Sequence, residues 1–353
     1  MIRAGFITPS LYWGGAERWL HDLALFSRDR IAWVGCAVTQ PTYNDDTMRK
    51  MIGKIMPIWG YGRTAVQHVG AAADVLIAWG TDNLAALTKG YSGKVVYTAH
   101  GSGEFDKRTA RRGANGATHL AAVSRKALDA FSPFVDTSTV EVLLNGINPA
   151  RCKIDRTREA VRRELGVAPD EFVVGYLGRL APDKRPAIIA EAVACLPEEF
   201  VGVWVGDGWD QDKQKAAITR ALGRRAIFHP RIEDIGNYLQ AFDCFVLASP
   251  SEGFSMAMLE AMLVGVPLVC TPVGAIPELR EKHGQLWEEV PIECTAKQLA
   301  KAIQTVKRMP MDALVERIIK AKAAVEENYL GQHMADRWVK YLERIIPTTG
   351  DKT

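Results

Sequence analysis

Short apolar runs alternate with longer amphipathic segments along almost the whole chain. The runs cover residues 2–7, 31–38, 54–58, 74–78, 94–99, 120–123 and 140–143, and they resume at 172–177, 200–205, 226–228, 244–248 and 267–270. Buried parallel strands have such continuous apolar sequences, and the segments between them form helices that cover the sheet. The pattern therefore predicts an α/β chain built on doubly wound parallel sheets.

Two consecutive series of strands indicate two domains. A chain of 353 residues is also too long for one ordinary hydrophobic core. Residues that favour turns cluster at 145–149, between the two series. We therefore place the domain boundary after Pro149, with a first Rossmann-like domain at residues 1–149 and a second at 150–331.

Composition argues against several classes of protein. The formal net charge is only +3, whereas a dedicated nucleic-acid-binding protein usually has a strongly basic face. No apolar run is long enough to span a bilayer, and the first residues lack the architecture of a signal peptide, so we expect a cytoplasmic protein. The six cysteines form no C-x-x-C pair, which favours free thiols over disulfides or a zinc site.

An acidic pair lies eight residues apart, at Glu252 and Glu260. Glu252 follows an apolar strand and stands beside Gly253 in a turn, and Phe254 and Ser255 lead into the helix that carries Glu260. Backbone N–H groups and the positive end of such a helix suit a diphosphate. Glu260 could then accept hydrogen bonds from a ribose diol, and Glu252 could accept them from a transferred sugar.

The residues around this pair resemble a known family. Positions 249–262 and 265–278 are similar to the family 4 glycosyltransferases, which are retaining enzymes of the two-domain GT-B fold. The resemblance implies two Rossmann-like domains that face each other across a cleft, and a last helix, at about 332–346, that crosses back to the first domain. It also implies that Glu252 acts in catalysis. The donor-binding residues that it implies in this stretch are Gly253, Phe254, Ser255 and Glu260.

A basic loop follows the first strand of the second domain. Arg179 and Lys184 lie in this loop, and both could reach one anion, Arg179 through two parallel hydrogen bonds and Lys184 as a point charge. Ligands bind at the carboxyl ends of strands in sheets of this kind. The resemblance implies that these two residues hold the diphosphate and stabilise the departing nucleoside diphosphate.

Two further loops of the second domain resemble the nucleotide pocket of the family. Gly206 and Asp207 end the second strand of this domain, where the family has a Gly-Asp-Gly loop. Arg231 and Ile232 lie in the loop that pairs with the base edge in the family. Pro230 departs from the family's usual glycine and removes an N–H donor. The base therefore stays open between uracil and guanine.

The first domain carries residues expected on the acceptor side. Gly14 and Gly15 allow close approach of a ligand to the backbone, and the resemblance implies that they contact the donor phosphate and the acceptor. Trp13 beside them offers an aromatic face for an acceptor. His100 closes a strand, and the resemblance implies that it positions the transferred sugar. The basic stretch 107–112 is interpreted as a solvated helix face, with attraction to an anionic acceptor or to lipid headgroups as the alternative.

The sequence Asp210-Gln211-Asp212 has the form of a D-x-D metal motif, but we interpret it as the start of a helix. Acidic residues favour the positive end of the helix dipole in any case. Arg179 and Lys184 can neutralise the diphosphate without a metal. We therefore expect no metal and no cofactor, with the nucleotide-sugar acting as a substrate.

These observations predict a retaining, metal-independent glycosyltransferase that uses a nucleoside-diphosphate-sugar, with a UDP-sugar favoured and a GDP-sugar as the alternative. The resemblance implies a same-face substitution, in which the leaving phosphate accepts the proton of the acceptor. The acceptor is a saccharide, a lipid-linked molecule or a small molecule. Two competing hypotheses are a nucleotide-sugar epimerase of the same fold and a non-catalytic protein that binds nucleotide-sugars.

Overall fold

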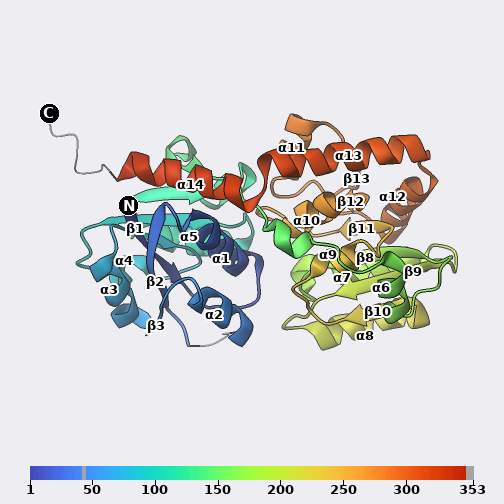
Figure 1. The fold of residues 1–353 in the computed structure, drawn as a ribbon, viewed down its shortest axis with the longest axis horizontal. Helices are drawn as coiled ribbons and strands as arrows, with labels where there is room; N and C mark the ends of the chain where they lie inside the picture. The colour runs from blue at the N-terminus through green and yellow to red at the C-terminus, as the bar shows by residue number, and fades with distance from the viewer. Residues whose placement is uncertain (42–44, 347–353) are drawn as a thin grey trace. The chain divides into compact units, whose positions relative to one another are not determined.

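The structure, a computed structural model, describes residues 1–41 and 45–346. These residues form two compact units (Figure 1). Among the described residues, unit 1 contains those of Met1–Ile147, Glu252–Phe254 and the segment 329–346, and unit 2 contains Asn148–Ser251 and Ser255–Asn328. The first passage between the units thus lies between Ile147 and Asn148, two residues before the predicted boundary.

Unit 1 is built on a seven-stranded parallel sheet with the strand order β3-β2-β1-β4-β5-β6-β7. The strands are β1 (Ile2–Thr8), β2 (Ile31–Val38), β3 (Ile58–Tyr61), β4 (Val75–Ala78), β5 (Lys94–Ala99), β6 (His119–Ala122) and β7 (Glu141–Val142). The α-helices are α1 (Gly15–Ser27), α2 (Asp46–Gly53), α3 (Gly62–Ala72), α4 (Leu84–Leu87), α5 (Glu104–Ala114) and α14 (Gly331–Ile345). Two short 3₁₀ helices complete the unit, η1 (Lys126–Ala130) and η2 (Thr137–Thr139).

Helix α14 completes the core of unit 1. The indole of Trp338 lies 5.5 Å from that of Trp19 on α1, measured between ring centroids, and both side chains are fully buried. Phe6 of β1 stacks on Trp33 of β2 at 4.3 Å and meets Trp19 edge-on at 5.8 Å. The last helix of the chain therefore belongs to the first unit, as the resemblance implies.

Unit 2 is built on a six-stranded parallel sheet with the order β10-β9-β8-β11-β12-β13. Its strands are β8 (Phe172–Leu177), β9 (Phe200–Val205), β10 (Ala226–His229), β11 (Cys244–Leu247), β12 (Leu268–Cys270) and β13 (Glu288–Glu289). Its α-helices are α6 (Arg158–Leu165), α7 (Pro186–Ala194), α8 (Gln211–Leu222), α9 (Ile235–Leu239), α10 (Met256–Val264), α11 (Ile276–His283), α12 (Ala296–Arg308) and α13 (Met311–Asn328). Its 3₁₀ helices are η3 (Pro149–Cys152), η4 (Pro182–Lys184) and η5 (Gly223–Arg225).

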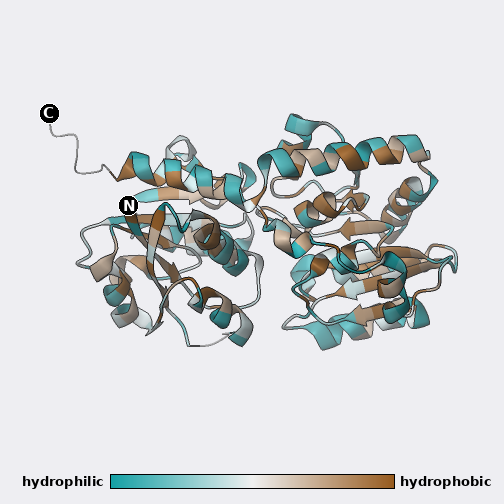
Figure 2. Cartoon of the chain, in the orientation of Figure 1, coloured by the Kyte–Doolittle hydropathy of each residue, from teal (hydrophilic) through white to brown (hydrophobic). Residues whose placement is uncertain are grey.

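The predicted fold class is confirmed, since both units are doubly wound and every strand pair is parallel among the described residues. Hydrophobic residues lie along the strands, and hydrophilic residues lie on the outer faces of many helices (Figure 2). No helix in the described ranges is both long enough and apolar enough to cross a membrane.

The strand predicted at 54–58 is wrong. The N–H groups of Ile55 and Met56 donate to the carbonyl oxygen of Ile52, so these residues close the end of α2. The strand β3 begins only at Ile58 and lies at the edge of the sheet. A short apolar run fits the end of a helix as well as a strand, which explains the error. The two-residue strand β13 was also not predicted.

Candidate functional site

The strand order of unit 2 reverses between β8 and β11. From β8 the chain proceeds outward through β9 and β10, and it then returns to the other side of β8 with β11. Ligands of doubly wound sheets bind outside the carboxyl ends of the strands at this point, because the two flanking loops diverge there. The loop after β8 carries Arg179 and Lys184, and the loop after β11 leads to Glu252 and Glu260.

A side chain of β8 forms a hydrogen bond to the turn that follows this strand. The hydroxyl of Tyr176 donates a hydrogen bond of 2.6 Å to the carbonyl oxygen of Arg179. The Arg179 guanidinium forms an ion pair of 2.9 Å with Asp183, and the Lys184 side chain is half-buried at the end of η4. Arg185 has a left-handed backbone, at φ +50°, which separates η4 from α7. The structure thus places Arg179 and Lys184 on one short turn.

The loops after β9 and β10 are joined to this turn. Gly206 has φ +138°, and a Cβ there would lie 2.2 Å from the carbonyl oxygen of Gly178, so only glycine fits. The Leu180 N–H donates to the carbonyl oxygen of Asp207 at 3.0 Å. The Asp207 carboxylate lies 3.6 Å from the Arg231 guanidinium. Three predicted loops therefore meet at one edge of the sheet of unit 2.

Two further residues, Ile232 and Trp209, lie in the loops at this edge. Ile232 is half-buried next to Arg231. Trp209, which the sequence analysis did not single out, follows the Gly206–Gly208 loop and is 65% exposed. Its position two residues after Asp207 was the available signal.

Glu260 lies inside α10, a helix whose neighbouring residues are apolar on almost every side. The residue is only 3% exposed, and its carboxylate forms an ion pair with the guanidinium of Arg151. Ser255 occupies the N-cap position of α10, and Gly265 ends the helix with φ +89°. Arg151 lies on η3, 109 positions earlier in the chain, and was missed in the sequence analysis.

The turn that carries Glu252 packs within unit 1. The carbonyl oxygen of Gly253 accepts a hydrogen bond of 2.8 Å from the Ser124 hydroxyl. A Cβ at Gly253 would lie 1.7 Å from the carbonyl oxygen of His100, so no other residue fits there without a backbone shift. Phe254 is buried, with its ring 5.9 Å from that of Tyr329. The structure therefore brings half-buried Glu252 into the same neighbourhood as His100.

His100 lies between two indoles of unit 1. Its ring centroid is 4.5 Å from that of Trp19 and 5.6 Å from that of Trp79, and both pairs meet edge to face. Its Nε2 atom is buried and has no hydrogen-bond partner among the described residues. Burial lowers the pKa of His100 to about 3, so the imidazole is neutral near pH 7. Trp79 follows β4 directly and was not singled out from the sequence.

The strand order of unit 1 also reverses, between β1 and β4. The loop after β1 carries Trp13 and Gly14, Gly14 is the N-cap of α1, and Gly15 is the first residue of that helix. A Cβ at Gly15 would meet no atom within 4 Å, so its backbone borders open space. The Trp13 ring is partly buried against the core of unit 1, and the Arg18 guanidinium lies 4.7 Å from its centroid. Packing thus occupies part of the face predicted to receive an acceptor.

The D-x-D sequence lies at the start of α8. Asp210 is its N-cap residue, and its carboxylate accepts a hydrogen bond of 3.0 Å from the Gln214 amide. Within residues 1–41 and 45–346, no cluster of three or more His, Cys, Asp and Glu side chains is arranged to hold a metal ion. The basic stretch 107–112 lies on α5, where Lys107 pairs with Glu104 at 3.3 Å.

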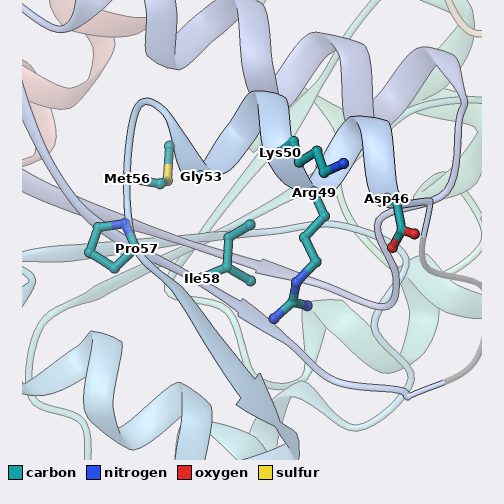
Figure 3. Close-up of a pocket in the computed structure, with 7 residues that line it drawn as sticks. All are labelled: Asp46, Arg49, Lys50, Gly53, Met56, Pro57 and Ile58. Carbon is teal, nitrogen blue, oxygen red and sulfur yellow. The ribbon is translucent and has the colours of Figure 1, made fainter.

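A separate pocket of about 430 Å³ lies in unit 1 (Figure 3). Its lining comes from α2 and from the segment that leads into β3, and it contains none of the predicted site residues. The lining residues are Asp46, Arg49, Lys50, Gly53, Met56, Pro57 and Ile58.

Comparison with known sequences gives partial matches. Residues 171–308 match the family model described as Glycosyl transferases group 1. The putative teichuronic acid biosynthesis glycosyltransferase TuaC of Bacillus subtilis (strain 168) is 32% identical over 192 residues, which is 54% of this chain and 47% of that protein. The D-inositol 3-phosphate glycosyltransferase of Mycobacterium sp. (strain KMS) is 35% identical over 127 residues, 34% of this chain and 29% of that protein. The aligned part of the chain thus spans less than half the length of these relatives.

Comparison with solved structures covers nearly the whole chain. The crystal structure of HepE from Anabaena in complex with UDP-glucose matches with a TM-score of 0.84 and 24% identity, over 98% of this chain and 100% of that one. WaaG, a glycosyltransferase involved in lipopolysaccharide biosynthesis, matches with a TM-score of 0.71 and 15% identity, over 98% and 100% of the two chains. The chain therefore has the GT-B fold, and its second unit carries the sequence pattern of the glycosyl transferases group 1.

Proposed function

We propose that the chain is a family 4 retaining glycosyltransferase that moves a sugar from a UDP-sugar to an acceptor hydroxyl without a metal ion. One observation carries this proposal. The Arg179–Lys184 turn and the loop that leads into the helix of Glu260 follow β8 and β11, the two strands at which the order of the sheet reverses. Cations and a carboxylate at that edge match the diphosphate and the ribose hydroxyls of a nucleoside-diphosphate-sugar.

In this proposal the diphosphate lies near Arg179, Lys184 and the N-terminus of α10. The first N–H groups of a helix have no partner within the helix, and they favour an anion. The Tyr176 hydroxyl holds the backbone of Arg179, so the positive charge is organised before the ligand arrives. These groups stabilise the nucleoside diphosphate as it departs.

The nucleoside is assigned to Glu260 and the loops after β9 and β10. Glu260 accepts hydrogen bonds from the ribose diol, while Gly206, Asp207, Arg231 and Ile232 border the base. HepE, whose fold this chain shares, has been crystallised with UDP and with UDP-glucose. This supports a uridine nucleotide over a guanosine nucleotide as the donor.

The reaction exchanges one C–O bond for another at the anomeric carbon of the donor sugar. The bond to the diphosphate oxygen breaks, the acceptor oxygen bonds to the anomeric carbon from the same face, and the departing phosphate takes up the acceptor proton. Glu252 binds hydroxyls of the transferred sugar. Because burial keeps His100 neutral, we assign it to positioning the sugar rather than to removing a proton.

The acceptor is assigned to unit 1, near Trp13, Gly14 and Gly15. These residues lie at the reversal point of the sheet of unit 1, and Gly15 borders open space. We propose a hydroxyl of a saccharide, of a lipid-linked molecule or of a small molecule.

A donor panel followed by a transfer assay tests the proposed function. UDP-, GDP- and ADP-sugars are compared by thermal shift, because a bound donor raises the apparent melting temperature. The donor that stabilises the protein most is then incubated with a mixture of acceptors, and NMR identifies the anomeric configuration of the product. We expect a UDP-sugar and a product of unchanged anomeric configuration. Epimerisation of the donor without acceptor, or binding with no turnover on any acceptor, would refute the proposal.

A further inference from the structure

Glu260 is a buried carboxylate in an apolar helix. It is 3% exposed, and its α10 neighbours Met258, Leu259, Ala261 and Met262 are buried as well. An isolated buried carboxylate loses its hydration and takes up a proton unless a cation or hydrogen-bond donors compensate. The guanidinium of Arg151 supplies such compensation through Nη1, which donates to Oε1 of Glu260.

Arg151 is itself held firmly. Its side chain is only 14% exposed, and it lies on η3, which begins after the capping residue Asn148. The Asn148 side chain accepts a hydrogen bond of 3.0 Å from the Ala150 N–H. On the other side, Cys152 packs its sulfur 4.0 Å from the carbonyl oxygen of Glu260.

Helix α9 packs against the C-terminal end of η3. A Cβ at Gly236 would lie 2.4 Å from the carbonyl carbon of Cys152, so the two backbones are in direct contact. The N-cap bond at Asn148 and this close approach fix the backbone on both sides of Arg151. A guanidinium on a fixed backbone can define the orientation of the carboxylate that it contacts.

We propose that Arg151 is a positioning residue for the donor, which orients the Glu260 carboxylate so that it can accept the hydroxyls of the ribose. This inference rests on the proposed function, because it assumes that Glu260 binds a ribose. Arg151 supplies a positive charge beside the carboxylate and holds one of its oxygen atoms. The ribose diol then meets an acceptor whose orientation is already set, which reduces the entropic cost of binding.

If Arg151 has this role, its replacement should weaken only the binding of the ribose hydroxyls. Wild-type protein should bind UDP more tightly than 2′,3′-dideoxy-UDP by about tenfold to a hundredfold, the effect expected for hydrogen bonds to a charged group. Replacing Arg151 should reduce this ratio towards one. Binding of inorganic pyrophosphate, which has no ribose and is assigned to Arg179 and Lys184, should stay within about twofold.

Calorimetry with these three probes tests the idea in four variants. Arg151→Met removes the cation, and Arg151→Lys keeps the charge without the planar group. Glu260→Gln removes the carboxylate, and the double variant carries Arg151→Met with Glu260→Gln. Arg156→Met is the matched control, because Arg156 lies on the same connecting segment but pairs with Glu164 instead. Melting temperatures are recorded for every variant, since removal of one partner of a buried ion pair destabilises a fold.

We expect Arg151→Met and Glu260→Gln to lose the preference for UDP over dideoxy-UDP to the same extent. The double variant should lose no more than either single variant. Arg151→Lys should retain part of the preference, and Arg156→Met should retain all of it. An unchanged UDP to dideoxy-UDP ratio in Arg151→Met would overturn the inference. Equal losses for UDP and pyrophosphate in both Arg151 variants would also overturn it, because Arg151 would then serve only the fold of unit 2. Failure of the wild-type protein to bind UDP or GDP would refute the proposed function, and this inference with it.

Discussion

The hydroxyl of Tyr176 donates a 2.6 Å hydrogen bond to the carbonyl oxygen of Arg179. Tyr176 is almost fully buried in β8, so it ties the turn that follows to the interior of unit 2. Lys184 stands five residues further along the same turn, at the end of η4. A cationic turn with a fixed backbone needs little rearrangement as negative charge develops on a departing diphosphate.

Arg179→Ala and Lys184→Ala should each lower kcat on the order of 100-fold, the typical cost of losing one organised charge partner. Neither side chain is fully buried, so the melting temperature should change by only a few degrees. Arg224→Ala is the control, because Arg224 is a highly exposed cation on η5. Rates of nucleotide release and thermal unfolding measure both effects. Wild-type turnover in both variants would exclude this turn from the active site.

Glu260 and Glu252 should prove to have separate roles. Glu260→Ala should weaken the binding of UDP and of the intact donor by about tenfold or more, because the ribose is common to both ligands. Glu252→Ala should weaken the intact donor only. Calorimetry with UDP and with the UDP-sugar separates the two effects. Equal losses for both ligands in both variants would contradict this division.

Stability should depend on pH through His100. Burial lowers its folded pKa to about 3 from an ordinary value of 6.5, so the stabilising contribution is complete above pH 6.5 and is lost as pH falls towards 3. Between pH 7 and pH 5 the wild-type protein should lose about 2 kcal/mol more unfolding free energy than His100→Asn. Urea unfolding at the two pH values measures the difference. Parallel losses in the two proteins would show that His100 is not held neutral.

Trp13→Ala should raise the KM of the acceptor about tenfold and leave donor affinity nearly unchanged, because an aromatic platform on unit 1 would be lost. Trp13→Phe keeps a ring and should retain much of the effect. Initial rates at saturating donor give the acceptor KM, and calorimetry gives the donor affinity. Loss of donor binding with an unchanged acceptor KM would assign this loop to the donor instead.

Activity should persist in excess EDTA, since Arg179, Lys184 and the N-terminus of α10 supply the positive charge that a metal would otherwise provide. The assay compares initial rates after dialysis against chelator with rates after manganese or magnesium is added back. Complete loss in EDTA, reversed by either ion, would disprove the metal-free mechanism.

Local spacing explains which parts of the molecule were predictable. Eleven of the described strands coincide with predicted apolar runs, the run at 54–58 was misplaced relative to β3, and β13 was too short to detect. Arg179 and Glu260 could be proposed as site residues because each lies a short distance after an apolar strand, in a stretch that resembles the glycosyltransferase family. That distance is a property of a few consecutive residues, and it can be read without knowledge of the rest of the chain.

Contacts between distant segments were not predictable in the same way. Nothing around Arg151 indicates that it pairs with a residue 109 positions away. The packing of Gly253 against the carbonyl oxygen of His100 likewise depends on how unit 1 is assembled. Trp79 follows an apolar strand as many core residues do, and only its contact with His100 sets it apart.

Helix α14 has a consequence for how the protein is made. The core of unit 1 includes Trp338, Val339 and Leu342, which are among the last described residues of the chain. A ribosome therefore releases the whole of unit 2 before the core of unit 1 can close over Trp19. Domains usually fold in the order of their synthesis. Here the unit whose translation begins first is the one that is completed last, and its uncovered apolar face has to be shielded until α14 has been synthesised.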